Sequence, residues 1–535
     1  MTADSASGSR RDLGAAIGLF LIVASLYALA SPGRIDTIDG QFRYEAAKNW
    51  YEKGIPEIDD PVLVGGTFAG LEGRRFTAYN APGCLFGIPF IALADLAVPR
   101  NEEVRRFAFG FVSPALGAAL AALTFLFFRR LGIGRRSAIG WSLAASTCTL
   151  LWPVASSAFD QVQHAFFLTL AAFLAFVAAE RKSLVVALAG GLSIGVAIMY
   201  QETYSILAPL LGIVCFAKGE GWKRGFGRYV AFGFGAATGL ALWAWYNYFR
   251  TGQLMVENRF GFGTLHPPLW GNPLDGALSL LVSPGRGVLF FSPLIVLAIA
   301  GIRPLHRRAP FLAWAICAAA VVHFSLISSF SFFSAEWCWG PRYLVVVLAL
   351  LHVGLPFAPP LRRRLLAVFL TIGCAVQLLG LSLEMSRYHY EHRHLKYFWA
   401  NRPFLYFRES QLAARPLEIL NTLFAERPEP KFFRPGPHPD QMTWAIQGVG
   451  DRSRPETWVP YFKVFYLPRP WPIWMASLPK NFRFIAVGKV AGLLVAAGAV
   501  GAFLILTMTR KRAVQGPDLL PAQRVDGTAG GQDDE

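Results

Sequence analysis

The sequence predicts an all-α polytopic membrane protein with about 12 transmembrane helices. Hydrophobic residues make up 54% of the 535 residues and charged residues only 16%, with a mean hydropathy of +0.39. Soluble domains usually carry about 25% charged residues. Apolar runs of roughly 17–25 residues recur along the chain, and a helix of this length crosses a hydrocarbon layer about 30 Å thick. The expected spans lie near residues 13–30, 107–128, 138–156, 163–179, 184–200, 203–217, 229–249, 286–302, 310–332, 342–357, 365–383 and 484–508.

The basic residues follow the pattern of membrane topology rather than that of a nucleic acid binding surface. The formal net charge is +17, but the charges fall in short clusters between the apolar runs. Clusters of Lys and Arg mark cytoplasmic loops. With 81–98 taken as a juxtamembrane or re-entrant segment, every strong cluster falls on the cytoplasmic side of a bacterial inner membrane, and so do both termini. The clusters are Arg10/Arg11, Arg129/Arg130/Arg135/Arg136, Arg181/Lys182, Lys218/Lys223/Arg224/Arg228, Arg303/Arg307/Arg308, Arg362/Arg363/Arg364 and Arg510/Lys511/Arg512.

The N-terminal part is predicted to consist of a short tail, a first span and a long outer loop. Residues 1–12 form a cytoplasmic tail, and 13–30 are expected to be an uncleaved span. A cleaved signal peptide is the alternative, because Ala28-Leu29-Ala30 gives an A-x-A pattern after a basic segment. Residues 31–106 form the first outer loop, which lies outside the cytoplasm in either case.

A helix along the membrane interface is expected within this loop, from Gln41 to Lys53. Aromatic side chains are favoured at the interface, and Gly54 with Pro56 would end the helix. The segment 81–98 contains proline and glycine near its start, so it is expected to lie against the membrane rather than to span it. The residues that recur at helical spacing in the interfacial helix are Phe42, Ala46, Trp50 and Tyr51.

The remaining chain is predicted to divide into a membrane module, an outer segment and a tail. Residues 13–383 form a transmembrane module that includes the first outer loop. Residues 384–483, rich in Pro, Arg and aromatic residues, form a periplasmic segment or small domain. After a last span at 484–508, the polar, glycine-containing residues 509–535 are expected to be a disordered cytoplasmic tail.

Two carboxylates in the first outer loop, Asp36 and Asp39, are the first candidates for chemistry. They stand beside Arg34 and Arg43, and an acidic side chain at the membrane edge is costly unless it is solvated or paired. One interpretation is structural, namely an ion pair with either arginine that caps the interfacial helix. The other is a general base for an acceptor hydroxyl, or a ligand of a divalent cation bridging to phosphate.

Two arginines at the outer entrances of spans, Arg286 and Arg342, are candidates for binding a substrate phosphate. Each stands beside glycine or proline, and guanidinium matches phosphate oxygens bidentately. The alternative is a long side chain that snorkels to the interface. Glu202, between two apolar runs, is either a ligand of sugar hydroxyls or a plain turn residue.

The six cysteines predict no metal or disulfide framework. They are scattered, mostly inside apolar runs, and no Cys-x-x-Cys motif occurs. We expect them to be buried small apolar residues. No cofactor is assigned with certainty, and a divalent cation near the aspartates remains an open alternative.

Several short motifs stand at the ends of the predicted spans. They are Asp39-Gly40-Gln41-Phe42-Arg43-Tyr44, Tyr79-Asn80-Ala81-Pro82-Gly83, Arg105-Arg106-Phe107, Arg129-Arg130-Leu131-Gly132, Asn258-Arg259-Phe260-Gly261, Ser283-Pro284-Gly285-Arg286-Gly287, Ser292-Pro293 and Trp339-Gly340-Pro341-Arg342-Tyr343. As a set, over residues 13–383, they resemble the GT-C class of membrane glycosyltransferases, which use polyprenyl-phosphate sugars. The chain is similar to the group that includes bacterial aminoarabinose transferases and protein O-mannosyltransferases.

The resemblance implies a catalytic aspartate in the first outer loop, just before an interfacial helix that carries Arg and Tyr. Here this residue is Asp39, and Asp36 is its competitor because the spacing to Arg-Tyr is one residue longer than in aminoarabinose transferases. The resemblance also implies a second acidic residue after the third span, which matches Asp160. The residues assigned to binding of the substrate or donor phosphate are Arg43, Tyr44, Asp160, Glu202, Arg286 and Arg342.

The leading functional hypothesis is transfer of a sugar from a polyprenyl-phosphate carrier to a lipid, glycan or protein acceptor at the periplasmic face. The alternative is a membrane transporter or lipid flippase of a cell-envelope pathway, which would place charges within spans and breaks at the bilayer midplane. A third is a non-catalytic membrane assembly protein, which would need neither aspartate. The polar residues gather at the outer ends of the spans, and this favours chemistry at the surface.

Overall fold

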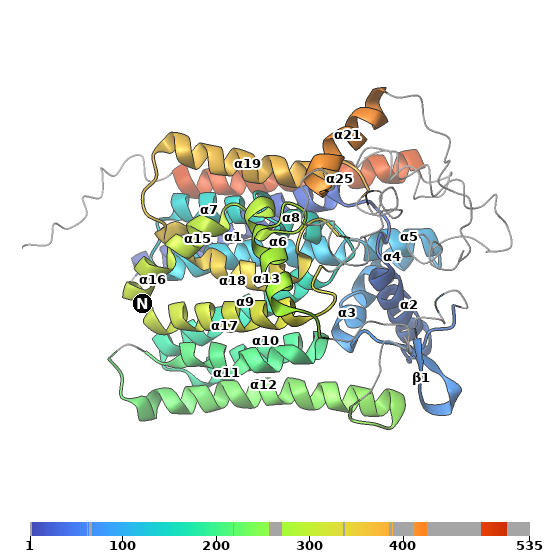
Figure 1. Ribbon diagram of the computed structural model, residues 1–535, viewed down its shortest axis with the longest axis horizontal. Helices are drawn as coiled ribbons and strands as arrows, with labels where there is room; N and C mark the ends of the chain where they lie inside the picture. The colour runs from blue at the N-terminus through green and yellow to red at the C-terminus, as the bar shows by residue number, and fades with distance from the viewer. Residues whose placement is uncertain are drawn as a thin grey trace, which may run out of the picture.

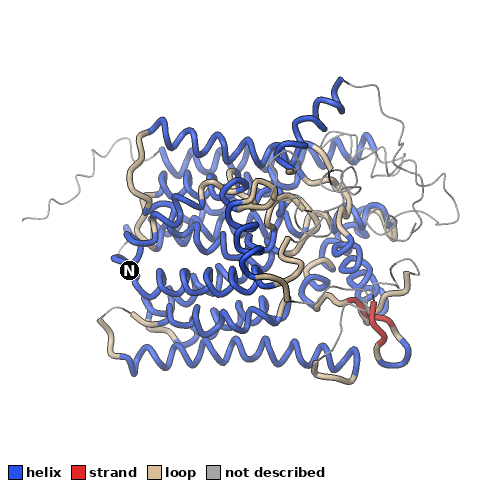
Figure 2. The backbone as a smooth tube through the Cα atoms, viewed as in Figure 1, coloured by secondary structure: helices blue, strands red, loops and turns tan. Residues whose placement is uncertain are grey.

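The computed structural model describes residues 3–60, 63, 67–217, 219–255, 270–334, 338–384, 388, 410–424 and 483–510. Within these ranges the chain is mostly helical, and the only sheet is a two-stranded hairpin (Figure 2). The long helices run side by side in an elongated bundle (Figure 1). The all-α polytopic class predicted from composition is confirmed.

Six described helical segments are long and apolar enough to cross a membrane. They lie in α1 (Ala3–Ala30), α5 (Glu102–Phe109) continued by α6 (Val112–Arg130), α9 (Gln161–Arg181), α17 (Pro310–Ser329), α19 (Arg363–Ser382) and α25 (Arg483–Arg510).

The other predicted spans coincide with shorter, broken or less apolar helices, so the number of about 12 spans stays a prediction. Proline interrupts several of these segments, because it removes a helical hydrogen bond. The elements are α7 (Arg135–Thr147), α8 (Leu151–Ala155), α10 (Leu184–Tyr200), η3 (Glu202–Ile206), α11 (Leu207–Gly212), η4 (Ile213–Cys215), α12 (Trp222–Thr251), α14 (Val288–Phe291), α15 (Ile295–Ala300), α16 (Ile302–Arg308), η5 (Arg342–Leu344), α18 (Val345–Leu351) and η6 (His352–Phe357). A further helix, α13 (Pro273–Val282), precedes α14.

At one end of the bundle lie segments whose basic clusters are predicted from the sequence to share one side of the membrane. Asp12 accepts from Arg129 at 3.0 Å and from Arg135 at 2.7 Å, and Arg135 also donates to the carbonyl of Met508. The N-terminal segment, the turn between α6 and α7 and the end of α25 therefore meet here, at what we call the basic end. This agrees with the positive-inside pattern.

The opposite end, which we call the site end, holds the first outer loop. This loop forms α2 (Ile38–Lys53), β1 (Thr67–Ala69), η2 (Leu71–Gly73), β2 (Arg75–Thr77), α3 (Ala81–Leu85), α4 (Ile88–Ala97) and α5 (Figure 1). Strands β1 and β2 pair antiparallel, with Phe68 opposite Phe76. The segment 81–98 is split at Gly87 into two short helices that pack near α2 and α5, and neither is long enough to cross a bilayer.

Helix α2 begins and ends close to the predicted residues. The hydroxyl of Thr37 caps the helix by accepting from the amide of Gly40. Gly54 ends it with φ 77°, a left-handed conformation that glycine adopts without strain.

The burial of α2 differs from the expected interfacial helix. Phe42 and Ala46 are buried as predicted, but Arg43 and Tyr44 on other faces are also buried, while Tyr51 is 42% exposed. The polar side chains of α2 bond to residues of α5 and of the turn before α9. The periodicity of α2 alone does not predict these partners. All but the last turn of the helix is therefore packed against protein, and its buried charges are held in fixed positions.

Helices α10 and α12 pack closely through glycine. A Cβ atom added to Gly239 would overlap the main chain of Gly195, and one added to Gly235 would overlap that of Gly191. Small residues at such spacing allow two helix backbones to approach in a membrane. This contact fixes α12, whose last turn reaches the site end.

Some predicted features lie mainly outside the described residues. Of the predicted outer segment 384–483, the structure describes Glu384, Tyr388, residues 410–424 and Arg483, and 410–424 contain α21 (Gln411–Phe424). The motif at 258–261 and nearly all of the predicted tail 509–535 also lie outside them.

Candidate active site

Asp39 and Arg342 meet at the site end, although 303 residues separate them in the sequence. Asp39 is the second residue of α2, and Arg342 opens η5 directly after Gly340 and Pro341. A guanidinium nitrogen of Arg342 donates to a carboxylate oxygen of Asp39 at 3.3 Å. The side chain of Asp39 is 17% exposed and that of Arg342 is 9% exposed. The residues predicted for catalysis and for phosphate binding are thus in contact.

The guanidinium group of Arg342 is also held by aromatic rings. Its central carbon lies 3.9 Å from the ring centroid of Phe159 and 5.3 Å from that of Tyr343. Arginine commonly stacks on aromatic faces in this way. Its Nε atom is buried and has no hydrogen-bond partner within the described part of the chain. Arg342 therefore retains a donor that suits an anionic ligand.

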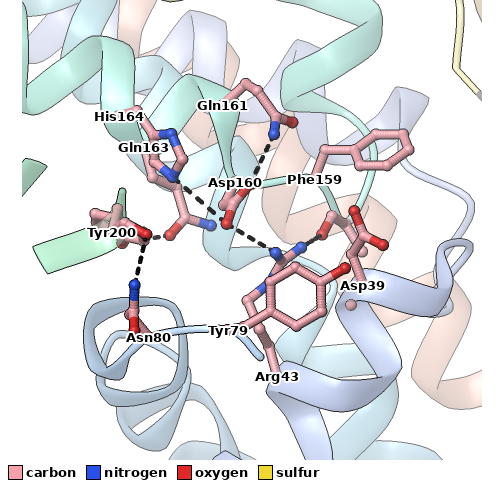
Figure 3. A network of polar contacts seen from close by, with 12 residues as sticks. Asp39, Arg43, Tyr79, Asn80, Phe159, Asp160, Gln161, Gln163, His164 and Tyr200 are labelled. Carbon is pink, nitrogen blue, oxygen red and sulfur yellow. Dashed lines mark hydrogen bonds and ion pairs between the residues drawn. The ribbon is translucent and has the colours of Figure 1, made fainter. Parts of the chain in front are cut away.

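Arg43 and Asp160 form a buried ion pair close to Asp39 (Figure 3). Nη1 of Arg43 lies 2.7 Å from Oδ2 of Asp160, and Nη2 donates to the carbonyl of Ala158 at 2.6 Å. Nε2 of His164 lies 3.4 Å from the same oxygen of Asp160. Burial raises the pKa of Asp160, but the charge of Arg43 and the contact with His164 outweigh burial and hold this pKa well below its usual value. Asp160 is therefore ionised and neutralises Arg43.

Tyr79 completes the surroundings of Asp39. The guanidinium carbon of Arg43 lies 5.1 Å from its ring centroid, and its hydroxyl faces the carboxylate of Asp39 (Figure 3). Burial raises the pKa of Tyr79 well above the ordinary value, and the charge of Asp39 and a hydrogen bond to it raise this pKa further. The phenol therefore stays protonated at neutral pH and donates to Asp39.

Helices α10 and α12 fix the segment that carries Tyr79. Asn80 donates to the carbonyl of Tyr200 at the end of α10, at 3.1 Å. Arg250, fully buried in the last turn of α12, donates to the carbonyls of Thr77 at 2.7 Å and Tyr79 at 3.3 Å. The close packing of α10 and α12 therefore helps to fix the position of Tyr79 in the site.

Asp36 occupies a structural position. Its carboxylate accepts from the hydroxyl of Ser157 at 2.9 and 2.8 Å and from the amide of Ala158 at 2.9 Å. These bonds fasten the start of the first outer loop to the turn before α9. Between the two predicted catalytic aspartates, the geometry favours Asp39, whose carboxylate is more exposed.

Arg286 supports the loop that carries Arg342. It is fully buried, and its Nη1 donates to the carbonyls of Cys338 at 2.9 Å and Gly340 at 2.7 Å. Buried main-chain carbonyls need such donors. In this conformation Arg286 acts on the site through Arg342, and its predicted contact with phosphate stays a prediction.

Tyr44 and Glu202 occupy other parts of the site end. The hydroxyl of Tyr44 donates to Glu102 on α5 at 2.9 Å, and Arg106 lies over the same ring. Glu202 is the first residue of η3 and is half-buried. The predicted roles of both residues in substrate binding stay predictions.

Three residues of the site were not predicted. Tyr79 belongs to a motif that the sequence singled out, but the motif alone does not show that its hydroxyl would face Asp39. His164 follows Asp160 by four residues, so helical spacing would have placed the two side chains on one face. Arg250 resembles any basic residue after an apolar run, and the sequence gives no signal for its burial.

The divalent cation that the sequence left open near the aspartates stays a prediction. Each of the three aspartates already accepts from protein donors: Asp36 from Ser157, Asp39 from Arg342, and Asp160 from Arg43. The described residues contain no group of three or more His, Cys, Asp or Glu side chains that could hold a metal ion.

The fold and the site define a membrane protein in which the partly exposed carboxylate of Asp39 bonds to the buried Arg342 at one end of the bundle. The sequence matches no family model and no curated protein. Among solved structures, the chain is similar to ArnT from Cupriavidus metallidurans in the apo state, with 13% identity and a TM-score of 0.44. The likeness covers 94% of this chain and 75% of that one.

ArnT in complex with undecaprenyl phosphate gives 15% identity and a TM-score of 0.41, with 94% of this chain and 78% of that chain covered. The archaeal oligosaccharyltransferase AglB from Archaeoglobus fulgidus gives 13% identity and a TM-score of 0.39, covering 84% of this chain and 59% of that one. Both neighbours are GT-C enzymes, the class that the sequence motifs resemble. Because these TM-scores are below 0.5, the likeness alone assigns no chemistry to this chain.

Proposed function

We propose that this protein is a glycosyltransferase that moves a sugar from a polyprenyl-phosphate carrier to a lipid, glycan or protein acceptor. The reaction takes place at the site end, facing the periplasm across a bacterial inner membrane. The observation that carries the proposal is the contact between the carboxylate of Asp39 and the guanidinium group of Arg342. It brings together the two residues to which the proposal assigns the base and the binding of phosphate.

Asp39 is the general base in this proposal. Its carboxylate takes the proton of the acceptor hydroxyl while the hydroxyl oxygen forms a bond to the anomeric carbon of the sugar. A positioned general base typically contributes about 10²–10⁴-fold to the rate. The hydroxyl of Tyr79 and the guanidinium group of Arg342 hold the carboxylate in place before the substrate arrives.

Arg342 stabilises the leaving group. When the bond between the anomeric carbon and the phosphate oxygen breaks, the electron pair stays on the polyprenyl phosphate. A guanidinium group aimed at this oxygen opposes the developing negative charge. The rings of Phe159 and Tyr343 restrict the movement of Arg342, so little order is lost when the phosphate binds.

The proposal is tested by substitution of the two aspartates in membranes that contain the full-length protein. Transfer from undecaprenyl phosphate carrying a radiolabelled hexose or pentose to membrane acceptors is measured for wild type, Asp39→Asn and Asp36→Asn. We expect kcat of Asp39→Asn to fall about 10²–10⁴-fold, with unchanged expression. Asp36→Asn should mainly reduce the amount of folded protein, because its contacts with Ser157 and Ala158 are structural.

Three outcomes would overturn the proposal. Full activity of both aspartate variants would refute the assignment of a general base. An Arg342→Lys variant with unchanged KM and kcat would refute the role of the guanidinium group. If wild type transfers none of these sugars but moves fluorescent lipid across proteoliposomes, the protein is a lipid transporter instead.

A further inference from the structure

Helix α21 has the reverse of the usual amphipathic pattern. Its buried residues include polar and charged side chains, whereas its most exposed residues are predominantly apolar. In a water-soluble helix the apolar stripe faces the core and the polar residues face solvent. The buried residues are Gln411, Ala414, Arg415 and Glu418, and the exposed large apolar residues are Leu417, Leu420, Leu423 and Phe424.

The polar face of α21 is bonded to the loop that carries Arg342. The side chain of Gln411 accepts from the amide of Gly340 at 3.0 Å and donates to the carbonyl of Cys338 at 2.7 Å. Arg415 donates to the carbonyl of Glu384 at 3.2 Å. These contacts explain why the polar residues of α21 point inward.

The apolar face of α21 points away from the protein. Leu417 is 62% exposed, Leu420 50% and Phe424 80%. They follow one another at helical spacings of three and four residues, and the exposed face bears no charged side chain. Four large apolar side chains on one face of a single helix are costly in water.

This face lies beside a helix that is a candidate for spanning the membrane. Helix α21 packs against α19, a membrane-spanning candidate whose Leu378, one turn before its end at Ser382, is 51% exposed. Figure 1 shows α21 rising from the region where α19 ends, beyond the outline of the bundle. An amphipathic helix beside the end of a membrane span can lie in the boundary between headgroups and acyl chains.

We propose that the apolar face of α21 docks into the lipid surface at the site end, while its polar face holds the Cys338–Gly340 loop. The helix connects the lipid surface to Arg342, because the loop held by Gln411 is the one that positions this arginine. The occupant of the exposed face is lipid, since the stripe is apolar and uncharged and the helix packs against the candidate membrane span α19. The inference does not depend on the proposed transferase reaction.

The test measures the depth of α21 in the membrane. Leu420→Cys and Asn421→Cys variants of the full-length protein are labelled with bimane and reconstituted in phosphatidylcholine vesicles with brominated acyl chains. An interfacial helix buries its apolar face by about 5–10 Å, so a label at 420 meets the bromines and is quenched at least about twofold more than one at 421. Asn421 is exposed on the flank of the same helix and serves as the matched control.

The labelled wild-type protein gives the background, because four of its six cysteines are buried and the other two are half-buried. Equal and weak quenching at both positions would overturn the inference, since the exposed face would then lie in water. A label at position 420 that is not quenched by the brominated lipid, together with cross-linking between two copies of the chain, would also overturn the inference, because the occupant of the face would be protein. Neither readout requires the enzyme to be active.

Discussion

The ion pair of Arg43 and Asp160 should act as one unit, and a double-mutant cycle tests this. The two side chains are 2% and 11% exposed, and their charged atoms lie 2.7 Å apart. Removal of one partner of such a pair leaves a buried charge and typically costs about 3–5 kcal/mol of the free energy of unfolding. We therefore expect this loss for Arg43→Met and for Asp160→Asn alone.

The double variant Arg43→Met/Asp160→Asn should lose much less than the sum of the single losses. It contains no unpaired charge, and it loses mainly the bond from Arg43 to the carbonyl of Ala158, worth about 1 kcal/mol. The coupling energy is the sum of the two single losses less the loss of the double variant, so it should be nearly as large as the two single losses together.

The free energy of unfolding is obtained from titration with denaturing detergent in mixed micelles, for wild type and the three variants. Exposure of the buried cysteines to a thiol-reactive dye reports unfolding independently. A coupling energy below about 0.5 kcal/mol would mean that the two substitutions are additive, as expected for independent sites. Such a result would refute the buried pair, and it would favour the predicted role of Arg43 as a direct ligand of phosphate.

Two further predictions follow from particular contacts. The pKa of Asp160 is lowered from an ordinary value of 3.8, so the contribution of this ionised group to stability is complete above pH 3.8 and is lost as pH falls below it. The difference in the free energy of unfolding between wild type and Asp160→Asn should therefore shrink from pH 5 to pH 3 in detergent titrations. A constant difference would contradict the lowered pKa. Gly239→Ala should destabilise the protein by about 1–3 kcal/mol because its Cβ would overlap Gly195. Gly233→Ala on the same helix, with no atom within 4 Å of the added Cβ, should be neutral or stabilising, and equal effects in thermal unfolding would contradict the close contact of α10 and α12.

The general fold was predictable because membranes restrict sequences strongly. Every backbone group in lipid must bond within its own segment or barrel, so long apolar runs imply helices. The basic clusters then oriented these helices, and the contacts of Asp12 with Arg129 and Arg135 join three segments that the sequence placed on one side. The number of spans was less accessible, because segments broken by proline do not form single long helices.

The candidate site was predictable in its residue types but not in its pairings. The sequence selected Asp39 and Arg342 for separate reasons, and only the fold shows that they touch. Arg43 was assigned to phosphate, yet its guanidinium group bonds to Asp160, which lies 117 residues away. Such long-range partners leave no periodic signal in the sequence. The inward polar face of α21 was also beyond prediction, because its partners are main-chain groups of a distant loop.

The long separation between Asp39 and Arg342 has a consequence for biosynthesis. Chains are synthesised from the N-terminus at about 5–20 residues per second, so the 303 residues between the two side chains take about 15–60 s to appear. Arg43 meets Asp160 well before that, and the first outer loop can be anchored while later helices are still absent. Asp39 acquires its arginine only after η5 has been made. A nascent or truncated chain therefore already carries this carboxylate but lacks its arginine partner until most of the membrane module has been made.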